Sequence, residues 1–198
     1  MDYSDHSVGA LYIRILAKSK TPSCLRLSIN LTYHPPSTLK PSAMNHSDSI
    51  INSIKDTSGD LNWQELLESV ITAFDCTAGT IHTFDQTTNL LMLQSQKGIP
   101  DFLLPKMSSI PIGKGMAGIA AERKTPVEMC NLQTDDSGVA RPAAKETKVE
   151  GSIAVPMLLE GKLYGTLGIA KPVPYDFTKA ESDALLKIGE EIAKSIKS

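Results

Sequence analysis

Two apolar runs decide the fold of this chain: Gly151-Ser-Ile-Ala-Val-Pro-Met-Leu158 and Lys162-Leu-Tyr-Gly-Thr-Leu-Gly-Ile-Ala170. The short link Leu159-Glu-Gly161 joins them, which predicts a pair of antiparallel strands. Ahead of them stand a glycine-punctuated helix start, Pro111-Ile-Gly-Lys-Gly-Met-Ala-Gly-Ile-Ala120, and the strand-like Thr125-Pro-Val-Glu-Met-Cys-Asn131. An apolar strand pair beside a short helix and a long polar loop favours a roofed cavity. No part of this region has the residue order of a catalytic centre, so it indicates a sensing or interaction module.

Helices are predicted on both sides of this region. Asn62 with Glu65 three residues later forms a capping-box pattern, and apolar residues recur at helical spacing from there to Phe74. Thr178 and Glu181 repeat the same pattern at the start of a last helix. Both helices therefore have one apolar face to bury.

Further strands are predicted between these helices. Gly79–Phe84 and Leu90–Gln94 alternate in the manner of a strand pair, and Val127–Cys130 adds a third short strand. The fold class that follows is α/β (α+β): a mostly antiparallel sheet of five to six strands, with the N- and C-terminal helices packed on one face. The second face is then free to hold a loop roof and a ligand.

Length and charge limit the classes of function. A chain of 198 residues holds one well-buried domain plus an extension. Residues 1–43 carry a formal charge of +3, whereas residues 44–198 hold 15 basic and 20 acidic side chains, a charge of −5. Nucleic-acid binding needs clustered Lys and Arg, so the acidic part argues against nucleic acid as a partner.

Cysteine usage and hydropathy point to a reducing, aqueous compartment. The three cysteines are far apart in the sequence and odd in number, which favours neither a disulfide framework nor a metal site, so we expect a cytoplasmic protein. No apolar run reaches the roughly 20 residues of a membrane span, and we expect no membrane partner. The pair Asp135-Asp136 lacks the spacing and further ligands of a calcium or magnesium site, and no metal is predicted.

Residues 1–47 differ from the rest of the sequence, and residues 48–198 are predicted to form a single domain. The first segment is rich in Ser, Thr and Pro, and it has no acidic residue between His6 and Ser47. We expect a disordered extension or a start assigned too early, with Met44 as the true first residue. A basic, acid-free N-terminus is also typical of an organelle transit peptide, and this alternative stays open.

An ordered set of segments carries a resemblance to a known family. After the helix that ends near Phe74 come, in order, Ala78-Gly-Thr-Ile-His82, Ile112-Gly-Lys-Gly-Met-Ala-Gly-Ile-Ala120, Pro126-Val-Glu-Met-Cys-Asn131, Ser152-Ile-Ala-Val-Pro156, Gly165-Thr-Leu-Gly168 and Phe177-Thr-Lys-Ala-Glu181. From about Leu61 to Ser195 the chain resembles a GAF domain. The resemblance implies a sensory and dimerisation module that holds a small molecule between the sheet and a loop roof. It also implies a homodimer or a signalling partner as the route of output.

The chain departs from the specialised branches of that family. Ala170-Lys171 and Glu181-Ser182 stand where the cyclic-nucleotide type has Asn-Lys and Asp-Glu, which argues against cyclic nucleotides. Cys130 lies in no bilin-attachment motif. Free methionine-(R)-sulfoxide reductase, the enzymatic branch, is implied to need at least two cysteines within reach, and Ala117 stands where its pattern places one. We therefore expect no enzyme activity, and no cofactor is identified.

The predicted ligand-binding residues lie on the sheet or along the roof loop between residues 131 and 150. They are Thr80, His82, Cys130, Asn131, Arg141, Glu150, Tyr164 and Thr166. Strand alternation places Thr80 and His82 on one face. Arg141 is one of two arginines after residue 43, and its planar cation would suit an anionic ligand.

Other roles for the same residues stay open. His82 would also suit the role of a hydrogen-bonded structural histidine, and Cys130 that of a small buried apolar residue. Asn131 would suit the cap of a loop, and Arg141 a solvated surface position. The alternative for the whole domain is an interaction or dimerisation module whose cavity is empty or filled by side chains.

Overall fold

A six-stranded sheet, antiparallel in every described pair, forms the centre of the fold in the order β3-β2-β1-β6-β5-β4. The computed structural model describes residues 41–57, 59–134 and 146–197, all within the unit Lys40–Ser198. The fold class predicted from the sequence is confirmed. The strands are β1 (Ala78–Asp85), β2 (Leu90–Lys97), β3 (Ser109–Pro111), β4 (Val127–Met129), β5 (Ser152–Leu159) and β6 (Lys162–Ala170).

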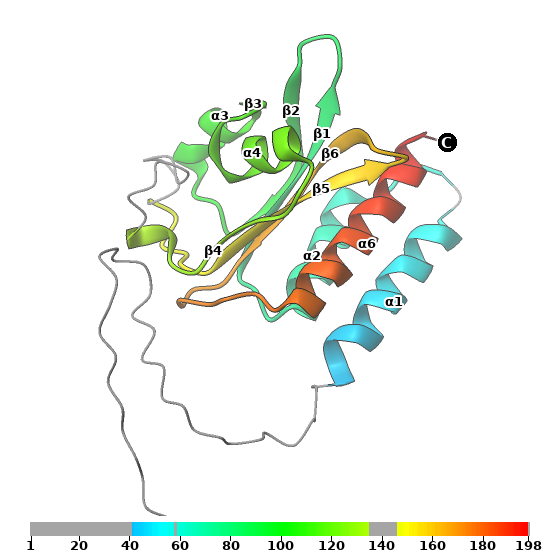
Figure 1. Cartoon of the computed structure of the whole chain (residues 1–198), viewed down its shortest axis with the longest axis horizontal. Coiled ribbons are helices and arrows are strands. Elements are labelled where there is room, and N and C mark those ends of the chain that lie inside the picture. Colours follow the sequence, from blue (N-terminus) through cyan, green and yellow to red (C-terminus); the bar gives the residue numbers. More distant parts are fainter. Residues whose placement is uncertain (1–40, 58, 135–145, 198) are drawn as a thin grey trace, which may run out of the picture. The chain divides into compact units, whose positions relative to one another are not determined.

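Three helices lie on one side of the sheet: α2 (Trp63–Ala73) and α6 (Lys179–Lys197) pack on the strands, and α1 (Pro41–Asp56) packs on these two helices. Figure 1 shows α2 and α6 against the strands, with α1 packed on both. The main core lies between these helices and the sheet. Its large, fully buried members include Leu67, Val70, Ile81, Ile153, Met157, Leu167, Leu185, Ile188 and Ile192.

Both predicted capping patterns form. At α2 the Oδ1 atom of Asn62 accepts a hydrogen bond from the Glu65 backbone amide at 3.2 Å. At α6 the exchange is reciprocal, because the Glu181 amide donates to Thr178 Oγ1 at 3.2 Å and the Thr178 amide donates to Glu181 Oε2 at 2.8 Å. Each helix start thus has amides satisfied by side chains, as the sequence predicts.

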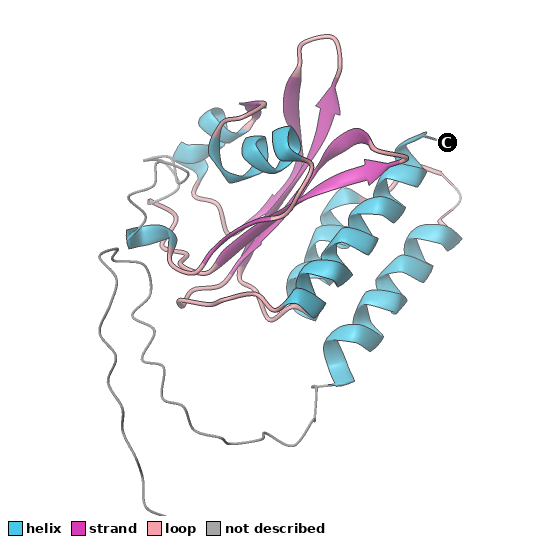
Figure 2. Cartoon of the chain, viewed as in Figure 1, coloured by secondary structure: helices cyan, strands magenta, loops and turns pink. Residues whose placement is uncertain are grey.

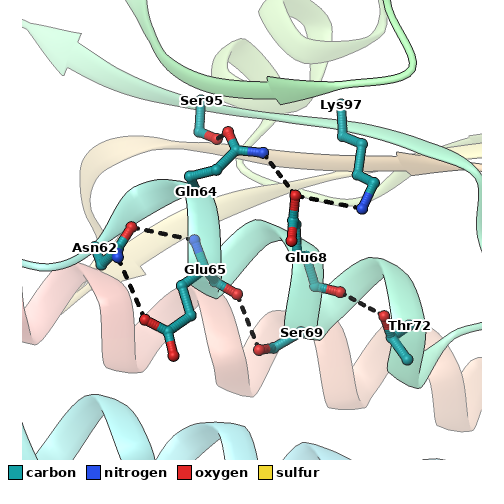
Figure 3. A network of polar contacts seen from close by, with 8 residues as sticks. All are labelled: Asn62, Gln64, Glu65, Glu68, Ser69, Thr72, Ser95 and Lys97. Atoms are coloured by element: carbon teal, nitrogen blue, oxygen red, sulfur yellow. Dashed lines mark hydrogen bonds and ion pairs between the residues drawn. The ribbon is translucent and has the colours of Figure 1, made fainter.

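A chain of polar contacts fixes α2 to β2 (Figure 3). Ser95 of β2 donates to Gln64 Oε1 at 2.7 Å, and the Gln64 amide donates in turn to Glu68 Oε1 at 3.0 Å. Lys97 completes the chain with an ion pair to Glu68 at 3.3 Å. The buried hydroxyl of Ser95 therefore has a partner, which holds the helix on this edge of the sheet.

The opposite face of the sheet is roofed by short elements, which Figure 2 shows as helix and loop above the strands. A 3₁₀ turn (Asp101–Leu103) leads into α3 (Leu104–Met107), and α4 (Gly115–Arg123) packs on β5 and β6. None of the described helices is both long and apolar enough to cross a membrane.

Helix α1 carries a short apolar stripe, which the described unit buries in its own core. Ile50 and Ile54 are only 6% and 4% exposed, and Ile51 packs against the same core. The stripe is therefore buried within a single chain, and it does not by itself require a second copy to cover it.

Candidate functional site

A cavity of about 610 Å³ lies between the sheet and its roof. Its floor comes from β1, β5 and β6, and its walls come from α3, β3, the first turn of α4 and the segment Thr147–Val149. The floor residues are Ala78, Gly79, Thr80, His82, Ser152, Ile153, Ala154, Gly168, Ile169 and Ala170. The remaining lining residues are Ile99, Pro105, Lys106, Met107, Ser109, Ile110, Lys114, Gly115, Met116, Ala117, Leu132, Thr147 and Val149.

The cavity exists because the two faces of the central strands carry side chains of different size. Toward the helices the strands place large residues such as Ile81, Val155 and Leu167. Toward the roof the side chains at Ala154 and Gly168 are small or absent. A Cβ added to Gly168 would meet protein atoms only at 3.5 Å or more, an ordinary contact. The packing of neighbouring residues therefore does not require glycine there.

His82 is the titratable side chain set deepest in the floor. Its ring is 1% exposed, and its Nε2 atom lies 3.0 Å from the backbone oxygen of Met107 in α3. Burial lowers the pKa of His82, and the hydrogen bond to Met107 opposes that shift to a smaller extent. The histidine thus joins the floor of the cavity to its roof.

Three buried polar atoms have no hydrogen-bond partner among the described residues: His82 Nδ1, Ser152 Oγ and Thr166 Oγ1. His82 and Thr166 face each other across the β1–β6 pair, and Ser152 lies on the cavity side of β5. A buried polar group without a partner costs about 1–3 kcal/mol. Three such atoms on one face of a sheet indicate that this face is built to meet something polar.

Positive charge gathers at the cavity wall. Lys106 and Lys114 are the charged side chains among the described lining residues, and both are exposed. Lys114 also stands at the N-cap of α4 without making a side-chain cap. The amides of Gly115, Met116 and Ala117 precede the first hydrogen bond within that helix, and all three residues line the cavity.

Two of the predicted site residues line the cavity, Thr80 and His82. Thr166 lies opposite His82 in the sheet but is not among the lining residues. Tyr164 does not reach the cavity, because its side chain packs with the core under the helices. The cause is a register shift in the β5–β6 pair: Met157 pairs with Gly165 and Leu158 with Leu163, so Tyr164 has no partner. Such a bulge reverses the side-chain alternation on which the prediction depended.

The predicted roof residues do not gather at the cavity. Asn131 Nδ2 donates to Glu150 Oε2 at 3.2 Å, and Asn131 Oδ1 accepts from the Gln133 amide at 2.9 Å, so this pair shapes the loop and does not line the cavity. Cys130 is outside the lining as well. Arg141 lies outside the described residues.

Several lining residues were missed by sequence reasoning. Lys106 and Met107 lie in α3, a helix of four residues that is too short to show a period. Lys114 directly precedes α4, and this helix start was predicted to lie beside a cavity without the lysine being singled out. Ser152 with Ala154, and Gly168 with Ala170, did carry a signal. Small residues at alternate positions of two buried strands indicate space on one face. No cluster of His, Cys, Asp or Glu among the described residues is arranged to hold a metal ion.

Comparisons with known proteins agree with this geometry. Three solved structures share the fold, each covering 78–79% of this chain. The GAF domain of an Acinetobacter phosphoenolpyruvate-protein phosphotransferase is 18% identical with a TM-score of 0.65 and 92% of its own chain covered. The corresponding domain from Coxiella burnetii is 17% identical, with a TM-score of 0.68 and 93% of its chain covered. Free methionine-R-sulfoxide reductase from Neisseria meningitidis, in complex with its substrate, is 17% identical, with a TM-score of 0.64 and 88% of its chain covered.

No curated protein matches the chain. The model of one family does match it, over residues 63–197, and this stretch holds the whole sheet, its roof and two of the three covering helices. We conclude that the chain belongs to the GAF domain family.

Proposed function

We propose that this chain is a cytoplasmic sensory or regulatory module that binds a small molecule in the cavity between the sheet and α3–α4. Binding would be passed on to a partner protein or to a second copy of the chain. The observation that carries the proposal is the cavity itself, about 610 Å³ in volume, on a sheet face that presents small side chains. Small-molecule sites in proteins span roughly 300–1,000 Å³ and are mostly apolar with a few polar groups.

The polar groups in this cavity support a binding role over a packing role. His82 and Ser152 carry unpartnered polar atoms in the floor, and the floor is otherwise apolar apart from Thr80. A purely structural face would gain stability from larger apolar side chains at Ala154 and Gly168. Retaining small residues beside buried polar atoms costs stability, which fits a site that a ligand completes.

We further propose that the module is not an enzyme. Ala117, at the position where the reductase resemblance expects a cysteine, lines the cavity wall. Cys76 packs against the core under the helices, and burial raises its pKa to about 12, so it is a protonated and unreactive thiol at neutral pH. These features support regulation over thiol chemistry.

The test is a thermal-shift screen of metabolites, repeated with a variant that fills the cavity. Gly168→Leu places a side chain where an added Cβ makes only ordinary contacts, so the fold should survive while the cavity shrinks. Any metabolite bound in the cavity should lose at least about tenfold in affinity, because bulk replaces ligand volume. Ala180→Leu, at an exposed position in the first turn of α6, is the matched control and should bind like the parent.

The same screen separates the two classes of function. Hits that bind parent and Gly168→Leu equally would place the ligand elsewhere and contradict the proposal. A complete absence of hits would favour the alternative module, which acts through protein contacts alone. The proposed contact of Arg141 with the ligand stays a prediction, and Arg141→Ala in the same titrations tests it.

A further inference from the structure

The protonation state of His82 limits what its free nitrogen can do. The backbone oxygen of Met107, 3.0 Å from Nε2, can only accept a hydrogen bond, so Nε2 must carry the proton. Burial lowers the pKa of the ring, which keeps it singly protonated near neutral pH. Nδ1 is then a bare acceptor. It has no partner among the described residues, and the side chain is 1% exposed.

The neighbouring hydroxyls do not satisfy this acceptor. Thr166 Oγ1 lies across the strand pair from His82, but it makes no hydrogen bond with any described residue. Ser152 Oγ on β5 likewise makes no hydrogen bond with any described residue. A hydroxyl can donate or accept, whereas Nδ1 can only accept. No described residue therefore donates a hydrogen bond to Nδ1 of His82.

The wall of the cavity, unlike the acceptor atom Nδ1 in the floor, presents positive charge and hydrogen-bond donors. Lys106 and Lys114 stand there, and no carboxylate is among the described lining residues, although residues 44–198 carry a formal charge of −5. The first turn of α4 adds amides that helix geometry leaves without partners. Cationic side chains and free helix amides at one wall favour an anion.

From the floor at His82 and the wall at Lys106 and Lys114, we propose that the cavity binds a compact anion with an apolar body. The end of this ligand that is buried at the floor donates a hydrogen bond to Nδ1 of His82. The anionic group would lie at the wall formed by Lys106, Lys114 and the start of α4. The apolar body would lie on Ala154, Gly168 and their neighbours. This assignment rests on the proposed function and names the ligand chemistry of the same cavity.

Three probes of nearly equal shape test the two ends separately by isothermal titration. Indole-3-acetate has a ring N–H and a carboxylate; benzothiophene-3-acetate replaces the N–H by sulfur; indole-3-acetamide replaces the carboxylate by a neutral amide. We expect indole-3-acetate to bind at least about tenfold more tightly than either of the others, the effect of one buried polar interaction.

Variants assign each preference to its residues. In His82→Gln the amide nitrogen takes the place of Nε2 and keeps a donor for Met107, but the acceptor is lost, so the preference for the N–H probe should disappear. His82→Asn keeps an acceptor near the position of Nδ1 and should retain that preference. If His82 served only to hold Met107, His82→Gln would bind the probes like the parent and His82→Asn would lose the preference for the N–H probe. Lys106→Met and Lys114→Met should each reduce the preference for the carboxylate, and Lys187→Met, exposed on α6, should not.

The outcomes distinguish this inference from the function on which it rests. Equal binding of all three probes, or binding by none of them, overturns the proposed ligand chemistry. If neutral metabolites then bind the parent but not Gly168→Leu, the cavity is still a binding site and only the ligand class is wrong. If no metabolite binds the parent at all, the proposed function also falls.

Discussion

At the scale of single residues, Lys171 shows how one buried charge closes a helix. Its side chain is 8% exposed, and its Nζ atom donates to the backbone oxygens of Phe74 and Asp75, just past the end of α2. The same ammonium lies 4.6 Å from the centroid of the Tyr175 ring. A lysine 96 or 97 residues away in the sequence thus caps α2 and ties it to the end of β6.

We expect Lys171→Met to reduce the free energy of unfolding by about 1.5–3 kcal/mol, the usual worth of hydrogen bonds from a charged group. Methionine keeps the apolar stem, so the loss reports the ammonium contacts. Urea unfolding followed by circular dichroism measures it, with the exposed Lys187→Met as control. Equal stability of the two variants would show that the cap contributes nothing.

His82 should make stability depend on pH. Because burial lowers its pKa in the folded state, the unfolded state binds more protons below the ordinary value of 6.5. Folding stability should therefore be full above about pH 7 and fall as the pH drops through 6.5, by at most about 1.4 kcal/mol per pH unit. Melting curves between pH 8 and pH 5 should show this loss in the parent and a smaller loss in His82→Gln. If the parent and His82→Gln lose stability equally between pH 8 and pH 5, the pH dependence does not come from His82.

At the scale of elements, the start of α6 concentrates its stabilising contacts on one carboxylate. Glu181 accepts from the Thr178 amide at 2.8 Å, from Thr178 Oγ1 at 2.8 Å and from the Tyr175 hydroxyl at 3.0 Å. Burial and the bond to Glu181 raise the pKa of Tyr175 to about 12, so it remains a donor. Thr178→Ala should cost about 1 kcal/mol in chemical denaturation, whereas Thr178→Ser should cost little. Identical losses in both variants would assign the effect to the methyl group instead of the cap.

How far the sequence predicts the fold depends on the regularity of each element. The two capped helices and the long strands were predicted nearly to their ends, because apolar period and capping pattern agree there. Strand β3 was not predicted, since three residues are too few to show an alternation. Tyr164 was assigned to the wrong face because β6 has a bulge at this residue. The bulge arises from the pairing of β6 with β5, and the alternation of residues within β6 alone gives no information about that pairing.

The candidate site was predicted less well than the fold, for a physical reason. Thr80 and His82 lie on a regular strand, so alternation placed them on the cavity face. The roof consists of α3, the start of α4 and loops, whose positions depend on tertiary contacts such as the bond from His82 to Met107. Local pattern carries little information about such contacts, and Asn131 and Glu150 proved to pair with each other.

At the scale of the whole molecule, α1 belongs to the core of the described unit. Ile54 is 4% exposed and packs in the main core, so Ile54→Ala should cost about 2–4 kcal/mol through a cavity within one chain. The difference in melting temperature between variant and parent should then be the same at low and high protein concentration. Ile196→Ala, at an exposed position of α6, is the control and should change stability by less than about 0.5 kcal/mol. If the difference in melting temperature becomes smaller as the protein concentration rises, Ile54 lies instead in an interface between copies of the chain.

The likeness to free methionine-R-sulfoxide reductase makes enzyme activity the sharpest whole-molecule test. Reduction of a sulfoxide by thiols needs an attacking thiolate at the substrate and a second cysteine to resolve the oxidised sulfur. In the described part of the chain no cysteine lines the cavity, Ala117 occupies its wall, and burial raises the pKa of Cys76 to about 12. We therefore expect no turnover of free methionine-(R)-sulfoxide above background in an assay coupled through thioredoxin to NADPH oxidation. Sustained turnover in the parent that disappears in Cys130→Ser would show that the cysteines do reach a substrate, and the regulatory assignment would give way to an enzymatic one.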